Sequence, residues 1–181
     1  MTGPNQERAV LDLDSAPRSE AIERLRACCG AERWALAMAD RRPFGDLARF
    51  LEAAEVEWAA LGPSDWREAI DHHPRLGGTG LAARKFDATR SLSEKEQAGV
   101  LDAAEAIRGA IADAQREYEN RFGFIFLIRA SGRSAAEILA EIERRMRNDP
   151  ETELAVAARE LREIARLRLE RLFGDAAGGS G

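Results

Sequence analysis

The chain holds only two histidines, and they are adjacent in the run His72-His73-Pro74-Arg75-Leu76-Gly77-Gly78. Imidazole is the side chain that titrates nearest neutral pH, so proton transfer falls most naturally to one of these two. Pro74 directs His73 out of the helical backbone region, and the glycine pair permits a tight turn or the close approach of a ligand. The run therefore predicts a helix that ends at an imidazole on the rim of a pocket. The alternative is a purely structural role, in which a histidine interacts with the dipole of the helix end.

The residues before this run predict the helices that hold it in place. Apolar side chains recur at three- and four-residue spacing over residues 47–58, as on the buried face of an amphipathic helix. Gly62-Pro63 then interrupts the pattern, and Ser64 or Asp65 can cap a short helix that runs through Ile70 to the histidines.

The second half of the chain is also mainly helical by pattern. After a loop at 76–92, one apolar face continues through a long helix at 93–121. The aromatic and β-branched run at 122–130 favours a buried extended segment. Ser134 caps a helix at 135–147, and Asp149-Pro150 is a typical start for a last helix that Gly174 ends.

Composition agrees with an all-α fold, since 45% of the residues are apolar, 33% are charged and few are aromatic. At 181 residues the chain is long enough for one compact domain with a substantial core. We expect about seven to eight helices in residues 18–173, between a flexible N-terminal arm at 1–17 and a flexible tail at 174–181.

Charge and cysteine usage exclude several classes of function. The net charge of −5 and the lack of a basic tract argue against a nucleic-acid partner. Cys28 and Cys29 are adjacent and form no CxxC or His/Cys cluster, so the sequence predicts no metal site and a reducing, intracellular location. No apolar stretch is long enough to cross a bilayer, and the N-terminus has no signal-type core.

Taken in order, the motifs of the chain resemble those of the 2-oxo-4-hydroxy-4-carboxy-5-ureidoimidazoline (OHCU) decarboxylases, which form (S)-allantoin in urate degradation. The resemblance covers residues 13–173. Each motif alone is weak evidence for the family, but the order of the motifs and the distances between them are specific to it. The matching segments are Arg42-Pro43-Phe44, His73-Pro74 with Leu76-Gly77, Ser93 with Glu96-Gln97, Phe122 to Phe126, Ala130 to Ser134, and Glu160 with Ile164 and Leu167-Arg168-Leu169.

The resemblance implies a set of site residues. The histidine directly before the proline is the catalytic one in the family, which indicates His73 and leaves His72 as the alternative. Glu96 is the second catalytic candidate, orienting the imidazole or holding the hydroxyl and ureido groups of the substrate. The residues implied in substrate binding are Pro74, Ser93, Gln97, the main chain around Phe124, Phe126 and Ile128, and Arg168.

Two of these residues have other interpretations. Ser93 and Glu96 are spaced as a capping box at the start of a long helix, and a carboxylate turned to the backbone cannot also serve the substrate. Arg168 lies in an arginine-rich helix, four residues after Ile164, on its apolar stripe. A buried arginine needs an anionic partner, which favours Arg168 over Arg166.

The implied enzyme needs no cofactor, because electrons released with carbon dioxide can enter the ring C=N bond. The resemblance further implies a small-molecule ureidoimidazoline substrate and a homodimer. The absence of a peroxisomal C-terminal tripeptide suits a cytoplasmic enzyme. Two other functions stay open: a helical interaction module without activity, and a hydrolase that acts on a related ureide with His73 as its general base.

Overall fold

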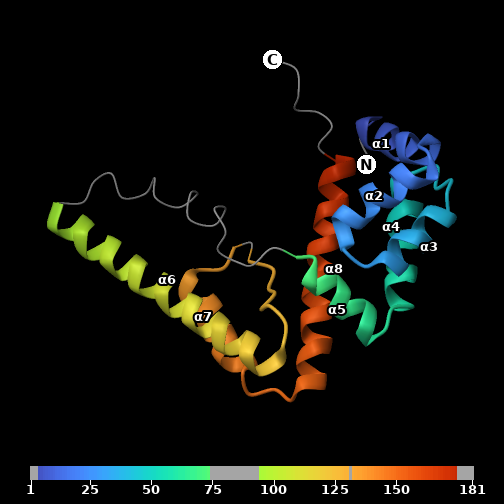
Figure 1. Ribbon diagram of the computed structural model, residues 1–181. Helices are drawn as coiled ribbons and strands as arrows, with labels where there is room; N and C mark the ends of the chain where they lie inside the picture. Colours follow the sequence, from blue (N-terminus) through green and yellow to red (C-terminus); the bar gives the residue numbers. More distant parts are fainter. Residues whose placement is uncertain (1–3, 74–93, 131, 175–181) are drawn as a thin grey trace. The chain divides into compact units, whose positions relative to one another are not determined.

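The structure, a computed structural model, describes residues 4–73, 94–130 and 132–174. These residues form eight α-helices and no β-strand, which confirms the all-α prediction (Figure 1). The helices are α1 (Pro4–Ser15), α2 (Arg18–Cys29), α3 (Glu32–Asp40), α4 (Leu47–Ala59), α5 (Pro63–Asp71), α6 (Glu94–Phe122), α7 (Ala135–Arg145) and α8 (Pro150–Gly174). None of the described helices is both long and apolar enough to span a membrane.

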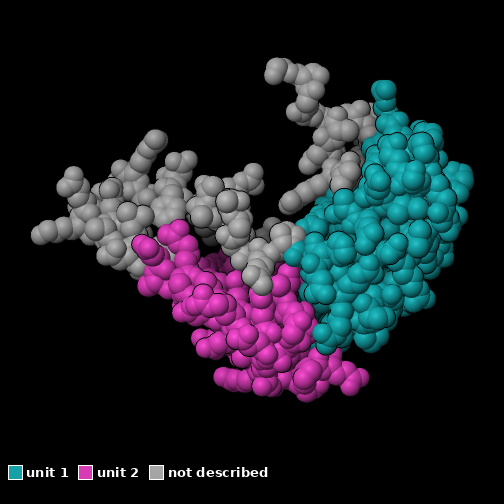
Figure 2. Space-filling view, viewed as in Figure 1, with its two compact units in different colours: residues 1–73, 154–181 teal, residues 74–153 magenta. Residues whose placement is uncertain are grey.

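Contacts within the chain divide it into two compact units, shown in different colours in Figure 2. Unit 1 comprises residues 1–73 and 154–181, and unit 2 comprises residues 74–153. Unit 1 therefore contains α1 to α5 and most of α8, whereas unit 2 contains α6, α7 and the first residues of α8. The sequence predicts one domain over residues 18–173, and the contacts within the chain form two compact units in that span.

The sequence predicts a flexible arm at residues 1–17, whereas the structure has a helix in this segment. Residues 4–15 form α1, in which Val10 and Leu13 are fully buried. The Arg42 guanidinium donates to the carbonyl oxygen of Leu13 at 2.7 Å, and the Asp14 carboxylate accepts from the backbone N–H of Phe44 at 2.9 Å. These long-range bonds, invisible in the local composition, hold the segment to the turn before α4.

The predicted apolar stripe over residues 47–58 is confirmed as the inner face of α4. Phe50, Ala54 and Trp58 are buried, and the indole N–H of Trp34 in α3 donates to the Ala54 carbonyl oxygen at 3.1 Å. The start of α5 differs slightly from its prediction. Its N-cap is Gly62, and the Asp65 carboxylate accepts from the Gly62 N–H at 2.9 Å. Pro63 at the first helical position shifts the helix start toward the N-terminus, as its fixed φ allows.

Unit 2 is built around the aromatic run that follows α6. Gly123, at φ 74°, ends the helix, and the next residues form no regular secondary structure. Phe124, Phe126 and Ile128 are at most 4% exposed, so the predicted burial is confirmed. The ring of Tyr118 packs edge-on against Phe124 and Phe126.

A buried arginine holds this run in place. Arg145, with no exposed surface, donates to the Leu127 carbonyl oxygen at 2.7 Å and to the Glu153 carboxylate at 2.7 Å. Glu153 also accepts from the Tyr118 hydroxyl and from the Asn148 side-chain amide. Burial raises the pKa of Tyr118 well above its ordinary value, so this hydroxyl stays protonated and acts as a donor.

Candidate active site

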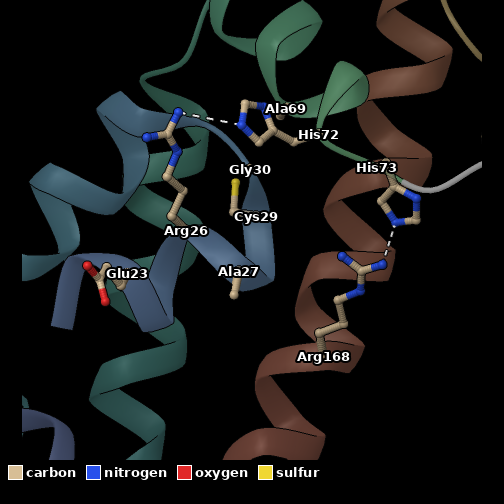
Figure 3. A pocket seen from close by; sticks show the side chains of 9 residues that line it. All are labelled: Glu23, Arg26, Ala27, Cys29, Gly30, Ala69, His72, His73 and Arg168. Carbon is tan, nitrogen blue, oxygen red and sulfur yellow. Dashed lines mark hydrogen bonds between the residues drawn. The ribbon is translucent and has the colours of Figure 1, made fainter. Parts of the chain in front are cut away.

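The two histidines at the end of α5 contact different arginines, His72 with Arg26 and His73 with Arg168. His72 is the C-cap residue, with φ −78° and ψ −6°, and its N–H donates to the Glu68 carbonyl oxygen at 3.2 Å. The N–H of His73 donates to the Ile70 carbonyl oxygen at 2.9 Å, which closes the last turn. Because the side chains of successive residues diverge at a helix end, each imidazole faces a different arginine (Figure 3).

Both histidines line a cavity of about 360 Å³ in unit 1. This volume lies at the lower end of the range of ligand sites, about 300–1,000 Å³, and suits a small ring compound. The cavity draws its walls from α2, the α2–α3 connection, the end of α5 and α8. The lining residues are Glu23, Arg26, Ala27, Cys29, Gly30, Ala69, His72, His73 and Arg168.

A close side-chain contact in this cavity joins His73 to Arg168. A guanidinium N–H of Arg168 lies 2.8 Å from Nε2 of the half-buried His73. Since a guanidinium only donates, His73 Nε2 must be the acceptor in this contact and carries no proton. The pair thus presents a basic nitrogen beside a cation, and an anion that draws Arg168 away would leave this nitrogen able to take a proton.

The second histidine belongs to a looser pair. His72 Nδ1 lies 3.1 Å from the Glu68 carbonyl oxygen, and its Nε2 lies 3.5 Å from an Arg26 guanidinium nitrogen. A carbonyl oxygen only accepts, so Nδ1 carries the proton and Nε2 is the acceptor toward Arg26. The Glu68 side chain accepts from Arg26 at 3.5 Å and from the backbone N–H of Glu32 at 3.3 Å. Glu68 therefore links α5 to α2 and to the start of α3.

Gly30 is the close-packed point of the cavity wall. It ends α2 in the left-handed conformation at φ 86°, and a Cβ built on it lies 2.9 Å from His72 Cβ and 3.0 Å from the Ala69 carbonyl oxygen. Real Cβ atoms do not come within 2.9 Å of another such atom, and 3.0 Å from a carbonyl oxygen is already tight, so glycine lets α2 end against the last turn of α5.

We expect Gly30→Ala to displace the end of α5 as well as to strain its own backbone. The left-handed conformation alone costs a non-glycine residue about 1–2 kcal/mol, and the clash with Ala69 adds to this. Gly45→Ala is the matched control, because Gly45 has φ 80° but no atom within 4 Å of the position that an alanine methyl group would take. Urea denaturation should show a larger decrease in the free energy of unfolding for Gly30→Ala than for Gly45→Ala. Equal losses for the two variants would contradict the close-approach role.

The two thiols next to Gly30 are not nucleophiles at neutral pH. Burial raises the pKa of Cys28 to about 11 and that of Cys29, which lines the cavity, to about 12. Both groups are free thiols rather than a disulfide, and a thiol with such a pKa holds almost no thiolate at pH 7. Within the described part of the chain no group of three metal-ligating side chains is found. Besides the Cys29 thiol, the ionisable side chains of the described cavity wall are those of the two histidines, the two arginines and Glu23.

The structure brings together two of the residues predicted from sequence, His73 and Arg168. It places Arg166, the disfavoured alternative, on an exposed face of α8 where it pairs with Glu170 at 3.0 Å. Phe124, Phe126 and Ile128 belong to unit 2. Pro74 and Ser93 lie outside the described residues, and Glu96 and Gln97 lie in α6 in a part whose side chains are not described.

Sequence reasoning missed Arg26, which lines the cavity, and its ion pair with Glu68. Arg26 and Glu68 are 42 residues apart, and nothing in the pattern of either helix distinguishes them from other solvated charges. It also missed the close approach at Gly30, although a glycine at a helix end is a recognisable C-cap signal.

Comparisons with known proteins point to one family. The profile of the OHCU decarboxylase family matches residues 14–170. The chain is 35% identical over 153 residues to the uric acid degradation bifunctional protein TTL of Arabidopsis thaliana, covering 84% of this chain and 47% of that protein. It thus spans about half of that relative. It is 37% identical over 132 residues to the 2-oxo-4-hydroxy-4-carboxy-5-ureidoimidazoline decarboxylase of Amia calva, covering 71% of this chain and 73% of that one.

A solved structure is similar over most of the chain. The crystal structure of an OHCU decarboxylase in the presence of (S)-allantoin superposes with a TM-score of 0.66 at 30% identity, covering 84% of this chain and 99% of that one. Both the sequence and the fold of the chain are therefore similar to those of one enzyme family.

Proposed function

The chain belongs to the OHCU decarboxylase family, and from that premise we propose that it converts 2-oxo-4-hydroxy-4-carboxy-5-ureidoimidazoline to (S)-allantoin and carbon dioxide. The observation that carries the proposal is the contact between His73 Nε2 and Arg168 on the wall of a 360 Å³ cavity. It supplies a base and a cation at one place in a site of suitable size.

The substrate itself accepts the electrons of the broken bond. Its carboxylate is on ring carbon C4, next to the C5=N bond. When the C4–carboxylate bond breaks, carbon dioxide leaves, the electron pair forms a C4=C5 bond, and the former C5=N pair moves to the ring nitrogen, which takes a proton. The C4 hydroxyl then loses its proton to become a carbonyl while C5 gains one, which gives allantoin.

His73 and Arg168 can supply what these reaction steps require, a group that transfers protons and a cation that binds the carboxylate. Arg168 binds the carboxylate and holds it out of the ring plane, and on doing so it releases His73 Nε2. The freed nitrogen takes the hydroxyl proton and returns a proton to one face of C5, so that a single enantiomer forms. We assign Glu96 to orienting this imidazole or to holding the hydroxyl and ureido groups of the substrate. Pro74, Ser93, Gln97 and the main chain around Phe124, Phe126 and Ile128 complete the proposed substrate contacts.

Assembly and location are part of the same proposal. We propose a homodimer, as the family resemblance implies and as symmetric dimers are the commonest oligomers. We also propose that it acts in the cytoplasm. Light scattering of the purified protein should give a mass of two 19.9 kDa chains, and a mass of one chain at working concentration would contradict the dimer.

Arg168→Met should lower kcat/KM for decarboxylation about 10- to 100-fold, the contribution of hydrogen bonds to a charged group. The neighbouring Arg166→Met is the matched control, because Arg166 is exposed and pairs with Glu170 outside the cavity. Initial rates of allantoin formation compare the two variants. A loss of similar size in both would show that general charge, not the His73 contact, is responsible.

The proposed activity is tested with substrate made in place from urate by an upstream oxidase and hydrolase. Carbon dioxide release and the circular dichroism of (S)-allantoin are followed together after the protein is added. We expect both signals to rise faster than in the spontaneous reaction. Ring opening without carbon dioxide would indicate the hydrolase alternative, and no acceleration by folded protein would favour the inactive interaction module.

A further inference from the structure

The cavity contains two imidazole–guanidinium pairs, and the reaction proposed above uses only one of them. Figure 3 shows the Arg26–His72 contact and the Arg168–His73 contact, with the small side chains of Ala27 and Cys29 drawn between them. Both arginines and both histidines line the same cavity. A bound molecule that touches Arg168 at one end therefore has a second polar pair within the same space.

The two pairs differ in their electrostatic surroundings. Arg26 already lies 3.5 Å from the Glu68 carboxylate, and the carboxylate of Glu23 lines the same cavity. Arg168, within the described residues, donates to the His73 imidazole and forms no ion pair with a carboxylate. An anionic group of a ligand is thus attracted to Arg168, whereas the surroundings of Arg26 suit a neutral polar group.

The Arg26–His72 pair offers one donor beside one acceptor. His72 Nδ1 is occupied by the Glu68 carbonyl oxygen, which turns the lone pair of Nε2 toward Arg26. The contact of 3.5 Å is at the limit of a hydrogen bond, so a ligand can separate the two groups with little loss. A ureido group has the complementary pattern, a carbonyl oxygen that accepts next to N–H groups that donate.

We propose that Arg26 and His72 form a subsite for the ureido group of the substrate, an inference that rests on the proposed function. The Arg26 guanidinium donates to the ureido carbonyl oxygen, and His72 Nε2 accepts from a ureido N–H. Glu68 keeps Arg26 in place and, through the Glu32 N–H, ties the subsite to the start of α3. With the carboxylate on Arg168, this subsite sets which face of the ring meets His73.

The test compares two ligands that differ only in the ureido group. (S)-Allantoin carries it and hydantoin is the same ring without it, so the ratio of their Kd values isolates its contribution. In titration calorimetry we expect Arg26→Met to weaken (S)-allantoin binding about 10-fold and to leave hydantoin binding unchanged. We expect the same selective loss for His72→Phe, which removes the acceptor.

Arg33→Met is the matched control. Arg33 forms a similar interhelical ion pair, with Asp65 at 3.1 Å, but does not line the cavity. It should leave both Kd values at the wild-type level, and the thermal unfolding temperatures of all variants should show that they are folded.

Two results would overturn the subsite. If Arg26→Met weakens both ligands by the same factor, Arg26 acts only by shaping the cavity. If it changes neither Kd, the ureido group is held elsewhere. Failure of the proposed function looks different, because wild-type protein would then neither release carbon dioxide from the substrate nor bind either ring compound.

Discussion

His73→Asn lowers kcat for decarboxylation by about 10²-fold or more, because asparagine can accept from Arg168 but cannot transfer a proton at pH 7. The substitution keeps a hydrogen-bond acceptor near Arg168, so the contact seen at 2.8 Å and the folded structure are disturbed little. KM should stay within a few-fold of the wild-type value. Initial rates of (S)-allantoin formation over a range of substrate concentrations measure both parameters.

His72→Asn provides the comparison within the same dipeptide. Since His72 faces Arg26 and Glu68 rather than Arg168, its loss should raise KM more than it lowers kcat. The reverse pattern, with kcat lost in His72→Asn and retained in His73→Asn, would exchange the roles of the two histidines. Equal losses of kcat would show that they act as one unit.

The largest effect on stability is expected for Arg145→Met in unit 2. Arg145 and Glu153 have no exposed surface, so removal of the guanidinium leaves a buried carboxylate without its counter-ion. The Leu127 carbonyl oxygen also loses its donor. We expect the free energy of unfolding to fall by about 3–5 kcal/mol, measured by urea denaturation.

Arg144→Met is the control at the next position. Arg144 pairs with Glu141 on the exposed face of α7, and loss of such a surface pair costs about 0–1 kcal/mol. The double variant Arg145→Met with Glu153→Leu should regain part of the lost stability, because no charge is then left buried. If Arg145→Met is as stable as Arg144→Met, the buried cluster does not stabilise unit 2.

Local signals allowed much of the helical fold to be predicted from the sequence. Ser134 accepts from the Glu137 N–H, which confirms it as the predicted cap, and Glu137 accepts in return from the Ser134 N–H. Asp149 likewise accepts from the Thr152 N–H at the start of α8. Such caps depend on neighbours in the chain, so sequence reasoning identifies them well.

Contacts between distant segments could not be predicted in this way. The arm expected at residues 1–17 instead contains α1, because Arg42 and the turn at Phe44 satisfy its backbone and Asp14. The same limit hid the contact of Arg26, which lines the cavity, with Glu68. His73 and Arg168 were found because a proline, a helical stripe and the family motifs identify them independently of each other.

The most direct test of the account is a crystal structure of this protein with (S)-allantoin. We predict that the ring lies in the cavity with Arg168 and His73 within hydrogen-bond distance, and that Arg168 has moved from His73 Nε2 to a ligand oxygen. The ureido group should contact Arg26 and His72. Allantoin bound away from His73, in a protein that produces it, would contradict the assignment of this cavity as the active site.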